Sequence, residues 1–356
     1  MPDSADLCVH ADNSIRETIE CIEKNEKQIA LVVDDDGRLI DTITDGDIRR
    51  AILAGLDLGT PVRVLRERKA GSFHSIPVTA PLGTDTAELL RLMEERCVRQ
   101  VPLLDEQGRV AGLITLREIL KSDSLPLQAV VMAGGYGKRL RPLTEDTPKA
   151  MLKVGDRPLL ESIIGQLRDS GIRNVNVSTH YMSQRIAEHF GDGSDFGVEI
   201  TYVEEDQPLG TAGALGLLKT SNEPILVING DILTQVDFRA MLEFHLDHEA
   251  DMTVAVKMYE HQVPYGVVEA RGVTLHRIVE KPVVRRFVSA GIYLLNPEAC
   301  SDIPSGKSFD MTELIERLSA GNSKVICFPV REYWMDIGKV EDYEKAQEDY
   351  SKVFKK

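Results

Sequence analysis

Residues 128–154 read QAVVMAGGYGKRLRPLTEDTPKAMLKV, and the other motifs of the chain can be arranged around this stretch. Its residues 129–133 are small or apolar, which is typical of a buried parallel strand. Three glycines follow the strand: Gly134, Gly135 and Gly137. Three basic residues come next: Lys138, Arg139 and Arg141. A glycine turn after a strand lets backbone N–H groups approach a phosphate, and the planar guanidinium of Arg139 can bind phosphate oxygens.

This turn matches neither of two common nucleotide-binding signatures. GGYGKR lacks the GxGxxG spacing of dinucleotide-binding proteins, and no GK[ST] of a P-loop follows it. Lys149 adds a further positive charge to the same stretch. A glycine turn with basic neighbours also occurs without a ligand, so the stretch alone predicts phosphate binding without naming the reaction.

Two carboxylates stand where a metal ion could be held beside such a phosphate. Asp231 ends the apolar run VINGD at 227–231, and Asp336 lies in YWMDIG at 333–338. One carboxylate from each of two distant strands, with phosphate oxygens and water, is a common way to hold Mg²⁺. An aspartate at the end of a strand can equally be a turn residue or a helix cap. Both interpretations remain open from these residues alone.

Composition bounds the class of protein. The 356 residues suffice for two domains, and 42% hydrophobic with 28% charged residues is ordinary for a globular protein. The net charge of −15 argues against a nucleic-acid partner. We expect no signal peptide, because residues 1–14 contain neither a basic nor an apolar region. We expect no membrane segment, because no apolar run reaches roughly 18 residues. The 5 cysteines form no CxxC pair, which favours reduced thiols and a cytoplasmic location.

Residues 13–121 contain an internal repeat. Each half has an amphipathic stretch, an apolar strand, an acidic turn ending in glycine, a second strand and a short closing helix. The turns are DDDG at 34–37 and DEQG at 105–108, and residues 54–80 between the halves are expected to be a linker with an extended lead-in. We expect one domain at 1–124, ending in the polar segment KSDSLPL at 121–127.

The remainder, 125–356, alternates strands and helices. Apolar strands are expected at 129–133, 175–178, 200–203, 225–228 and 252–256, with helices between them, for example at 159–170 and 182–190. This alternation predicts an α/β fold with a mostly parallel sheet and helices on both faces. Ligands of such sheets bind beyond the carboxyl ends of the strands, where the glycine turn and Asp231 are expected. Residues 340–356 are predicted to form one closing helix.

The repeat resembles a tandem CBS pair, also called a Bateman module. In that family a Thr-x-x-Asp element contacts the ribose of an adenosine nucleotide, and Thr44 and Asp47 match it in the first half. The second half has Thr115 and Glu118, so one of its two positions differs. The resemblance implies a regulatory or dimer-forming role and a regulatory nucleotide. A carboxylate at a helix start can also simply stabilise the helix.

The string GGxGxRLxPLT…PKxMLxVGxxPLLE resembles the superfamily of nucleotidyltransferases that activate sugar 1-phosphates. The resemblance implies a Rossmann-like sheet, Mg²⁺ as cofactor on Asp231 and Asp336, and catalytic roles for these residues: Arg139, Lys149, Asp231 and Lys281. It assigns the nucleotide to Gly134, Gly135, Gly137, Lys138, Gln207, Gly210 and Thr211. It assigns the sugar to Gly266, Glu280, Gly291 and Tyr293. Lys138 is a departure, because many relatives carry threonine there.

The implied reaction is attack of a sugar-phosphate oxygen on the α-phosphorus of a nucleoside triphosphate, with loss of pyrophosphate. The attacking phosphate is already an anion, so catalysis needs positioning and charge neutralisation rather than a base. The full motif set is most similar to hexose-1-phosphate guanylyltransferases, which implies GTP with mannose or glucosamine 1-phosphate and a homo-oligomer, either dimer or tetramer. A uridylyl- or thymidylyltransferase of the glucose-1-phosphate type, and a catalytically silent nucleotide sensor, remain alternatives.

Overall fold

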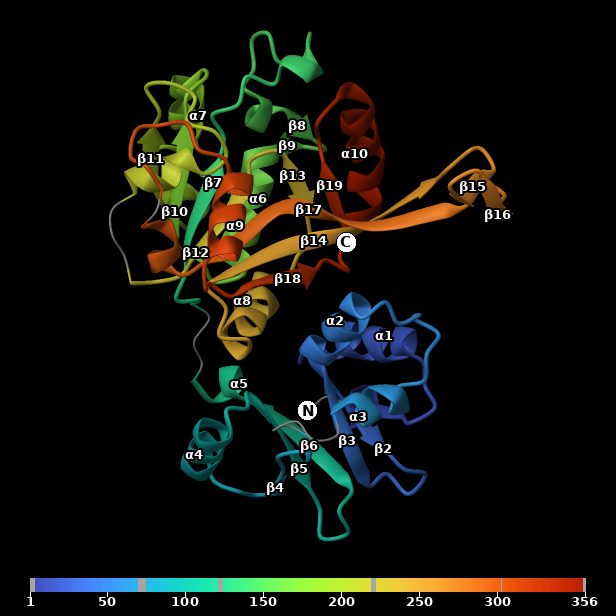
Figure 1. The fold of residues 1–356 in the computed structure, drawn as a ribbon. Helices are drawn as coiled ribbons and strands as arrows, with labels where there is room; N and C mark the ends of the chain where they lie inside the picture. Colours follow the sequence, from blue (N-terminus) through green and yellow to red (C-terminus); the bar gives the residue numbers. More distant parts are fainter. Residues whose placement is uncertain (1–3, 70–74, 121–123, 219–221, 302, 355–356) are drawn as a thin grey trace. The chain divides into compact units, whose positions relative to one another are not determined.

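The computed structural model describes residues 4–69, 75–120, 124–218, 222–301 and 303–354 (Figure 1). The chain divides into two compact units, Met1–Asp123 and Ser124–Lys356. Each unit has its own sheets and its own buried core, and each is described by itself below. Among the described residues, no helix is long and apolar enough to cross a membrane.

The first unit consists of two similar halves. The first contains η1 (Ser4–Leu7), β1 (Cys8–His10), α1 (Ile15–Asn25), β2 (Ile29–Val33), β3 (Leu39–Thr44), α2 (Asp45–Leu53) and α3 (Arg63–Lys69). The second contains β4 (Ala80–Pro81), α4 (Thr86–Arg96), β5 (Gln100–Leu104), β6 (Val110–Thr115) and α5 (Leu116–Leu120). Each half forms a three-stranded sheet in which a parallel pair is followed by a hairpin. The helix α3 falls within 54–80, where only a linker was expected.

Local sequence explains these elements. All five residues of β2 are buried and apolar, while α1 begins with a capping box in which Ser14 and Glu17 each bond to the other's backbone N–H. The two acidic hairpin turns also join the halves, because the N–H of Leu39 donates to the carbonyl of Gly108 at 3.1 Å. The repeat therefore folds as one closed unit rather than as two independent halves.

The second unit is built on a seven-stranded sheet with the order β11-β10-β7-β12-β17-β14-β18. The strands are β7 (Gln128–Met132), β10 (Asn174–Thr179), β11 (Glu199–Glu204), β12 (Ile225–Asn229), β14 (Met252–Gln262), β17 (Val283–Leu295) and β18 (Val325–Pro329). Within this sheet β17 runs antiparallel to both neighbours, and the other strands run parallel to one another. The predicted mostly parallel sheet is confirmed, with one reversed strand that the sequence analysis did not expect.

Helices and small ribbons surround this sheet (Figure 1). The α-helices are α6 (Leu159–Asp169), α7 (Ser183–Phe190), α8 (Phe238–Asp247), α9 (Met311–Ala320) and α10 (Val340–Val353). The 3₁₀ turns are η2 (Lys138–Leu140), η3 (Lys149–Met151), η4 (Ser194–Phe196), η5 (Gly213–Leu217) and η6 (Pro297–Cys300). Three two-stranded ribbons complete the unit: β8 (Lys153–Val154) with β9 (Arg157–Pro158), β13 (Ile232–Thr234) with β19 (Trp334–Asp336), and β15 (Val267–Arg271) with β16 (Thr274–Val279).

Strands β14 and β17 continue beyond the sheet as a long two-stranded arm that carries the β15–β16 hairpin at its tip (Figure 1). The residues of β14 are buried from Met252 to Val256 and largely exposed after that point. Every residue of β15 is exposed. The arm is therefore an extension of the core sheet into solvent rather than part of the core.

Candidate active site

A pocket of about 250 Å³ lies at the carboxyl ends of β7 and β12. Its lining residues are Met132, Ala133, Gly135, Gly137, Lys138, Arg139, Lys149, Ala150, Gly230, Asp231 and Gly338. The two strands converge here because Gly230 has no side chain: a Cβ on it would lie 2.7 Å from the carbonyl oxygen of Met132. Its N–H donates to that same oxygen at 2.9 Å. Asp231 is thereby placed directly beside the glycine turn.

The glycine turn shapes one wall of the pocket. Gly137 has φ 61°, in the left-handed region that favours glycine, and a Cβ there would lie 3.2 Å from the Cβ of Lys149. The hydroxyl of Thr144 donates to the Gly137 carbonyl at 2.8 Å and holds the loop against the turn. This close approach is what allows Arg139 and Lys149 to line one pocket. The Lys138 ammonium lies 5.3 Å from the centre of the Tyr136 ring, so it turns toward an aromatic face.

The two carboxylate oxygens of Asp231 differ in their partners. Its Oδ2 forms an ion pair with the ammonium of Lys149. Its Oδ1 is buried and has no hydrogen-bond partner among the residues that the structure describes. A buried carboxylate oxygen without a partner is costly, so an additional cationic ligand is expected there.

Asp336 reaches the same place through the β13–β19 ribbon. The two strands are antiparallel with Ile232 opposite Asp336, and the N–H of Ile337 donates to the Asp231 carbonyl at 3.0 Å. Partial removal from water and then the negative charge of Asp231 raise the pKa of Asp336, while Lys149 and Arg139 lower it. Two neighbouring carboxylates fit Mg²⁺, provided that phosphate oxygens and water complete its coordination.

One hydrophobic cluster lies next to all four charged residues of the site: Arg139, Lys149, Asp231 and Asp336. Its buried members are Leu140, Leu152, Val154, Leu159, Leu233, Ile337, Ala346 and Tyr350. Arg139 directly precedes Leu140, and Asp336 directly precedes Ile337. Lys149 and Asp231 lie within three residues of other members. The charged groups of the pocket are therefore held by a common core that α10 helps to close.

The segment predicted to bind the nucleobase has structural partners. The N–H and hydroxyl of Thr211 both donate to Oδ1 of Asp310, at 2.9 and 3.2 Å. Gly210, with φ 78°, lies so close to Asp310 that a Cβ would stand 2.6 Å from that same oxygen. The amide of Gln207 donates to the Gly306 carbonyl at 3.3 Å. These contacts order the loop before η5, and a nucleobase role for the three residues stays a prediction.

Residues that sequence reasoning missed lie at the ends of β10 and β11. The Tyr136 hydroxyl is 3.0 Å from Nε2 of His180, whose Nδ1 lies 2.7 Å from the carbonyl of Glu205. The Glu205 carboxylate accepts from the hydroxyl of Ser178 and, at 2.9 Å, from the N–H of Leu209. His180 directly follows β10 and Glu205 directly follows β11. These two positions were the available signal, since parallel neighbouring strands end at the same edge of the sheet.

The residues predicted to bind the sugar fall into two places. At the base of the arm hairpin, a Cβ on Gly266 would lie 3.1 Å from Glu280, and the N–H of Lys281 donates to the Tyr265 carbonyl at 3.3 Å. Lys281 has φ 44°, a left-handed conformation that costs a lysine about 1 kcal/mol and often marks functional sites. Among the described residues, the lining of the pocket does not include Gly266, Glu280 or Lys281.

The other two sugar residues lie on the core part of β17. Gly291 has φ 68°, and a Cβ there would stand 2.7 Å from the amide nitrogen of Asn229, two residues before Asp231. The Tyr293 hydroxyl is 3.0 Å from the hydroxyl of Ser289, and burial raises its pKa. Gly291 is therefore beside the pocket strand, while Tyr293 is a buried member of the sheet.

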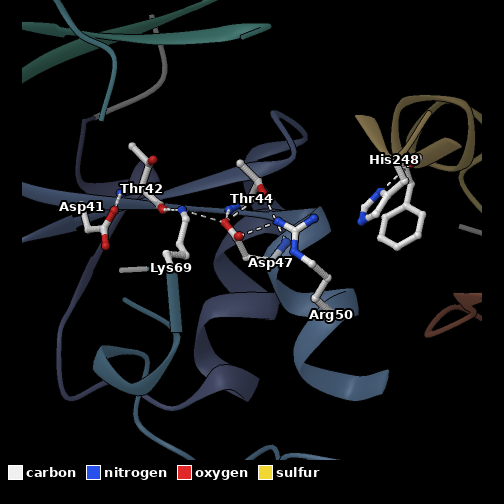
Figure 2. Close-up of polar contacts among 8 residues, drawn as sticks. Asp41, Thr42, Thr44, Asp47, Arg50, Lys69 and His248 are labelled. Carbon is white, nitrogen blue, oxygen red and sulfur yellow. Dashed lines mark hydrogen bonds and ion pairs between the residues drawn. The ribbon is translucent and has the colours of Figure 1, made fainter. Parts of the chain in front are cut away.

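In the first unit, Thr44 and Asp47 form the capping box of α2 (Figure 2). The Asp47 carboxylate also receives Lys69 at 2.9 Å and Arg50 at 2.7 Å. Burial would raise the pKa of Asp47, but Lys69, Arg50 and the backbone N–H of Thr44 outweigh it and hold that pKa below its usual value. Lys69 also donates to the Thr42 carbonyl at 2.7 Å. The carboxylate predicted to bind a ribose thus already has a full set of protein partners.

Comparison with known proteins assigns the two units of the chain to two different families. Residues 128–353 match the family described as nucleotidyl transferase, and residues 3–54 and 70–124 match the CBS domain. The chain is 34% identical over 227 residues to a mannose-1-phosphate guanyltransferase of Pichia angusta, covering 61% of this chain and 62% of that protein. It is 32% identical over 231 residues to a mannose-1-phosphate guanylyltransferase of Mycobacterium tuberculosis, covering 63% and 64%. It therefore spans less than two thirds of the length of these relatives.

A solved structure from Bacillus anthracis, named as a glucose-1-phosphate thymidylyltransferase in complex with sucrose, is also similar. It is 26% identical, with a TM-score of 0.50, over 62% of this chain and 94% of that one. Its match supports the sheet and its connections rather than a particular substrate. Because residues 128–353 make up more than half of the chain, the protein belongs to the nucleotidyl transferase family and carries a pair of CBS segments ahead of that domain.

Proposed function

We propose that this protein transfers a nucleotidyl group from a nucleoside triphosphate to a sugar 1-phosphate, with release of pyrophosphate. One observation supports the proposal above the others. Asp231 has a buried carboxylate oxygen without a described partner, in a pocket that Lys149, Arg139 and a glycine turn line together. Those are the groups needed to neutralise a polyphosphate and a metal ion at one point.

In the proposed reaction a phosphate oxygen of the sugar 1-phosphate forms a bond to the α-phosphorus. The bond from that phosphorus to the bridging oxygen breaks, and pyrophosphate leaves with the electron pair. Mg²⁺ held by Asp231 and Asp336 would supply positive charge at the phosphates. Arg139 and the backbone N–H groups of the turn bind the triphosphate. Lys149, anchored on Asp231, neutralises charge at the reacting phosphate.

We infer that GTP is the donor and mannose 1-phosphate the preferred acceptor. The relatives at 32–34% identity are named mannose-1-phosphate guanylyltransferases. The Glu205 carboxylate would lie 3.4 Å from a Cβ on Gly134, so it is next to the turn. Guanine presents N–H donors on its pairing edge. These donors can bond to the Glu205 carboxylate, which only accepts hydrogen bonds. Glu280 and Lys281, at the base of the arm hairpin, would bind the sugar hydroxyls and its phosphate.

We further propose that the CBS pair binds a regulatory adenosine or guanosine nucleotide at Thr44 and Asp47. Asp47 is 5% exposed and holds two cations, Lys69 and Arg50. A ribose whose hydroxyls donate hydrogen bonds to the Asp47 carboxylate would free these cations for the phosphates of the nucleotide. Nucleotide binding would then exchange an internal ion pair for a ligand, and this exchange is the physical basis of the proposed switch.

Pyrophosphate release tests the proposal. The full chain is assayed with each common nucleoside triphosphate and with mannose, glucosamine and glucose 1-phosphates in the presence of Mg²⁺. We expect the GTP and mannose 1-phosphate pair to give the highest kcat/KM. A highest value with UTP or dTTP would reject the guanylyl assignment alone. Absence of release with every pair would reject transfer and favour a nucleotide sensor without catalysis.

A further inference from the structure

Lys257 lies where β14 passes from the buried core sheet into the exposed arm. Residues Met252–Val256 of this strand are buried in the core sheet, and the residues after Lys257 are exposed in the arm. On one side Lys257 is paired with Val288 of β17, at the root of the arm. On the other side β18 has just ended: Val256 is paired with Pro329, and the N–H of Val330 donates to the Val256 carbonyl at 2.8 Å.

The Lys257 ammonium binds three successive carbonyl oxygens of the chain that follows β18. It donates to Val330 at 3.2 Å, to Arg331 at 3.3 Å and to Glu332 at 2.8 Å. An ammonium group has three N–H donors, so all of them are used on one turn of backbone. Burial lowers the pKa of Lys257, and the carboxylate of Glu332 partly offsets this. Burying a charged group costs free energy unless hydrogen bonds compensate for the lost water. The three carbonyl oxygens provide that compensation for Lys257.

This turn leads directly into β19 and Asp336. The Tyr333 carbonyl accepts from the N–H of Gln235 at 3.0 Å, next to β13, and the Trp334 indole donates to the Ala290 carbonyl of β17 at 2.8 Å. The strand that carries Asp336 is thus held from three sides: by β13, by β17 and by Lys257. Lys257 belongs to β14, which together with β17 also builds the arm.

We propose that Lys257 is a positioning residue for the metal carboxylate Asp336. By holding the turn between β18 and β19 against the root of the arm, it keeps Asp336 at the distance from Asp231 that a shared cation requires. It also keeps the hairpin with Lys281 in a fixed relation to that cation. The inference rests on the proposed function, because it takes Asp336 as a metal ligand.

A purely structural role makes a different prediction. In that case Lys257→Met would lower the stability of the second unit and leave metal binding unchanged. Asn296→Ala is a matched control, since Asn296 also holds backbone, donating to the Ala250 carbonyl at 3.0 Å, at a place away from the pocket. Lys257→Arg retains the charge and several donors, so it should recover part of what Lys257→Met loses.

The test measures GTP binding by calorimetry, once with Mg²⁺ and once with EDTA, without sugar phosphate. For the wild type we expect tighter binding with Mg²⁺, and for Asp336→Asn little difference between the two conditions. Lys257→Met should reduce the ratio of the two affinities about fivefold or more while the EDTA value stays within about twofold. Asn296→Ala should keep the wild-type ratio, and Lys257→Arg should fall between wild type and Lys257→Met.

The outcomes separate the inference from the function it rests on. A wild-type ratio above one with an unchanged ratio in Lys257→Met overturns the positioning role alone. A wild type whose GTP affinity ignores Mg²⁺ overturns the proposed metal site, and the inference with it. Fluorescence of Trp334 reports whether each variant is folded, because it is the single tryptophan of the chain. If Lys257→Met does not fold, Lys257→Gln takes its place in the comparison, and a wild-type ratio in Lys257→Gln overturns the inference.

Discussion

The ion pair between Lys149 and Asp231 is the feature of the pocket most sensitive to a single substitution. Both side chains are partly buried, with 14% and 24% of their surface exposed. Without the ammonium, Asp231 would face Asp336 across a site with less positive charge. In the proposed mechanism, Lys149 both holds Asp231 by this ion pair and neutralises charge on the substrate phosphate.

Lys149→Met should reduce kcat about 100-fold or more, the usual effect of removing one charge-stabilising donor from a transition state. Lys149→Arg keeps the charge and should lose less. Steady-state kinetics at saturating substrates measure both, with Trp334 fluorescence as the check on folding. A Lys149→Met variant with kcat within threefold of wild type would contradict the assigned role.

Lys281 should act on the sugar phosphate rather than on the nucleotide. Lys281→Ala is expected to raise KM for the sugar 1-phosphate about 10-fold or more and to change KM for GTP little, because one charged hydrogen bond is lost at one substrate. Arg285→Ala is the control on the same arm, since Arg285 pairs with Glu260 at 2.7 Å on the surface. Equal effects of the two substitutions would mean that the arm acts through general charge.

At the scale of elements, the sequence predicted most of the sheet. The strands at 129–133 and 225–228 appear as β7 and β12, because continuous apolar runs bounded by turn residues are strong signals. The reversed direction of β17 could not be predicted, since strand direction depends on the route of the chain and leaves no mark in the composition of the strand. The helix α3 was missed because its seven residues, RVLRERK, contain little apolar periodicity.

The site was predictable to the extent that its residues carry local motifs. Asp231 and Asp336 were predicted to meet, and the β13–β19 ribbon brings them together across more than a hundred residues. The contacts of His180 and Glu205 depend on the order of β7, β10 and β11, which no local pattern encodes. The three bonds of Lys257 likewise depend on a turn in another part of the chain.

His245 in α8 predicts a pH dependence for the second unit. It is 1% exposed, its Nε2 lies 3.1 Å from Asn296 Oδ1 and its Nδ1 lies 2.8 Å from the Thr253 hydroxyl. Burial lowers the pKa of His245 below 6.5, and the contact with Asn296 opposes this in part. As pH falls through about 6.5, the unfolded chain takes up a proton that the folded chain refuses until a lower pH. Stability contributed by this residue is therefore present above pH 6.5 and lost below it.

We expect the free energy of unfolding of the second unit to fall between about pH 7 and pH 5, and to fall less steeply in His245→Gln. The difference should be about 1 kcal/mol across that interval. Urea unfolding followed by Trp334 fluorescence measures it, because Trp334 lies in this unit. Parallel pH profiles for the wild type and His245→Gln would show that His245 does not contribute to the pH dependence of stability.

At the scale of the whole molecule, a nucleotidyl transferase domain and a pair of CBS segments share one chain. If the CBS unit senses a nucleotide, ATP or GTP analogues that cannot react should change the rate of the wild type. Asp47→Asn should abolish that change and leave the basal rate within about twofold, because the substitution removes the negative charge and replaces one of the two acceptor oxygens by an NH₂ donor while keeping the shape. Titration of the initial rate with adenosine and guanosine nucleotides measures this. A response that persists in Asp47→Asn would place the sensor elsewhere.

The most direct test of the proposed nucleotidyl transfer is to identify the product. GTP, mannose 1-phosphate and Mg²⁺ are incubated with the full chain and followed by ³¹P NMR. We expect the two diphosphate signals of GDP-mannose, with pyrophosphate in an equal amount, and neither product in an Asp231→Asn variant that keeps wild-type Trp334 fluorescence. Hydrolysis of GTP without a sugar nucleotide, or near wild-type turnover in Asp231→Asn, would contradict it.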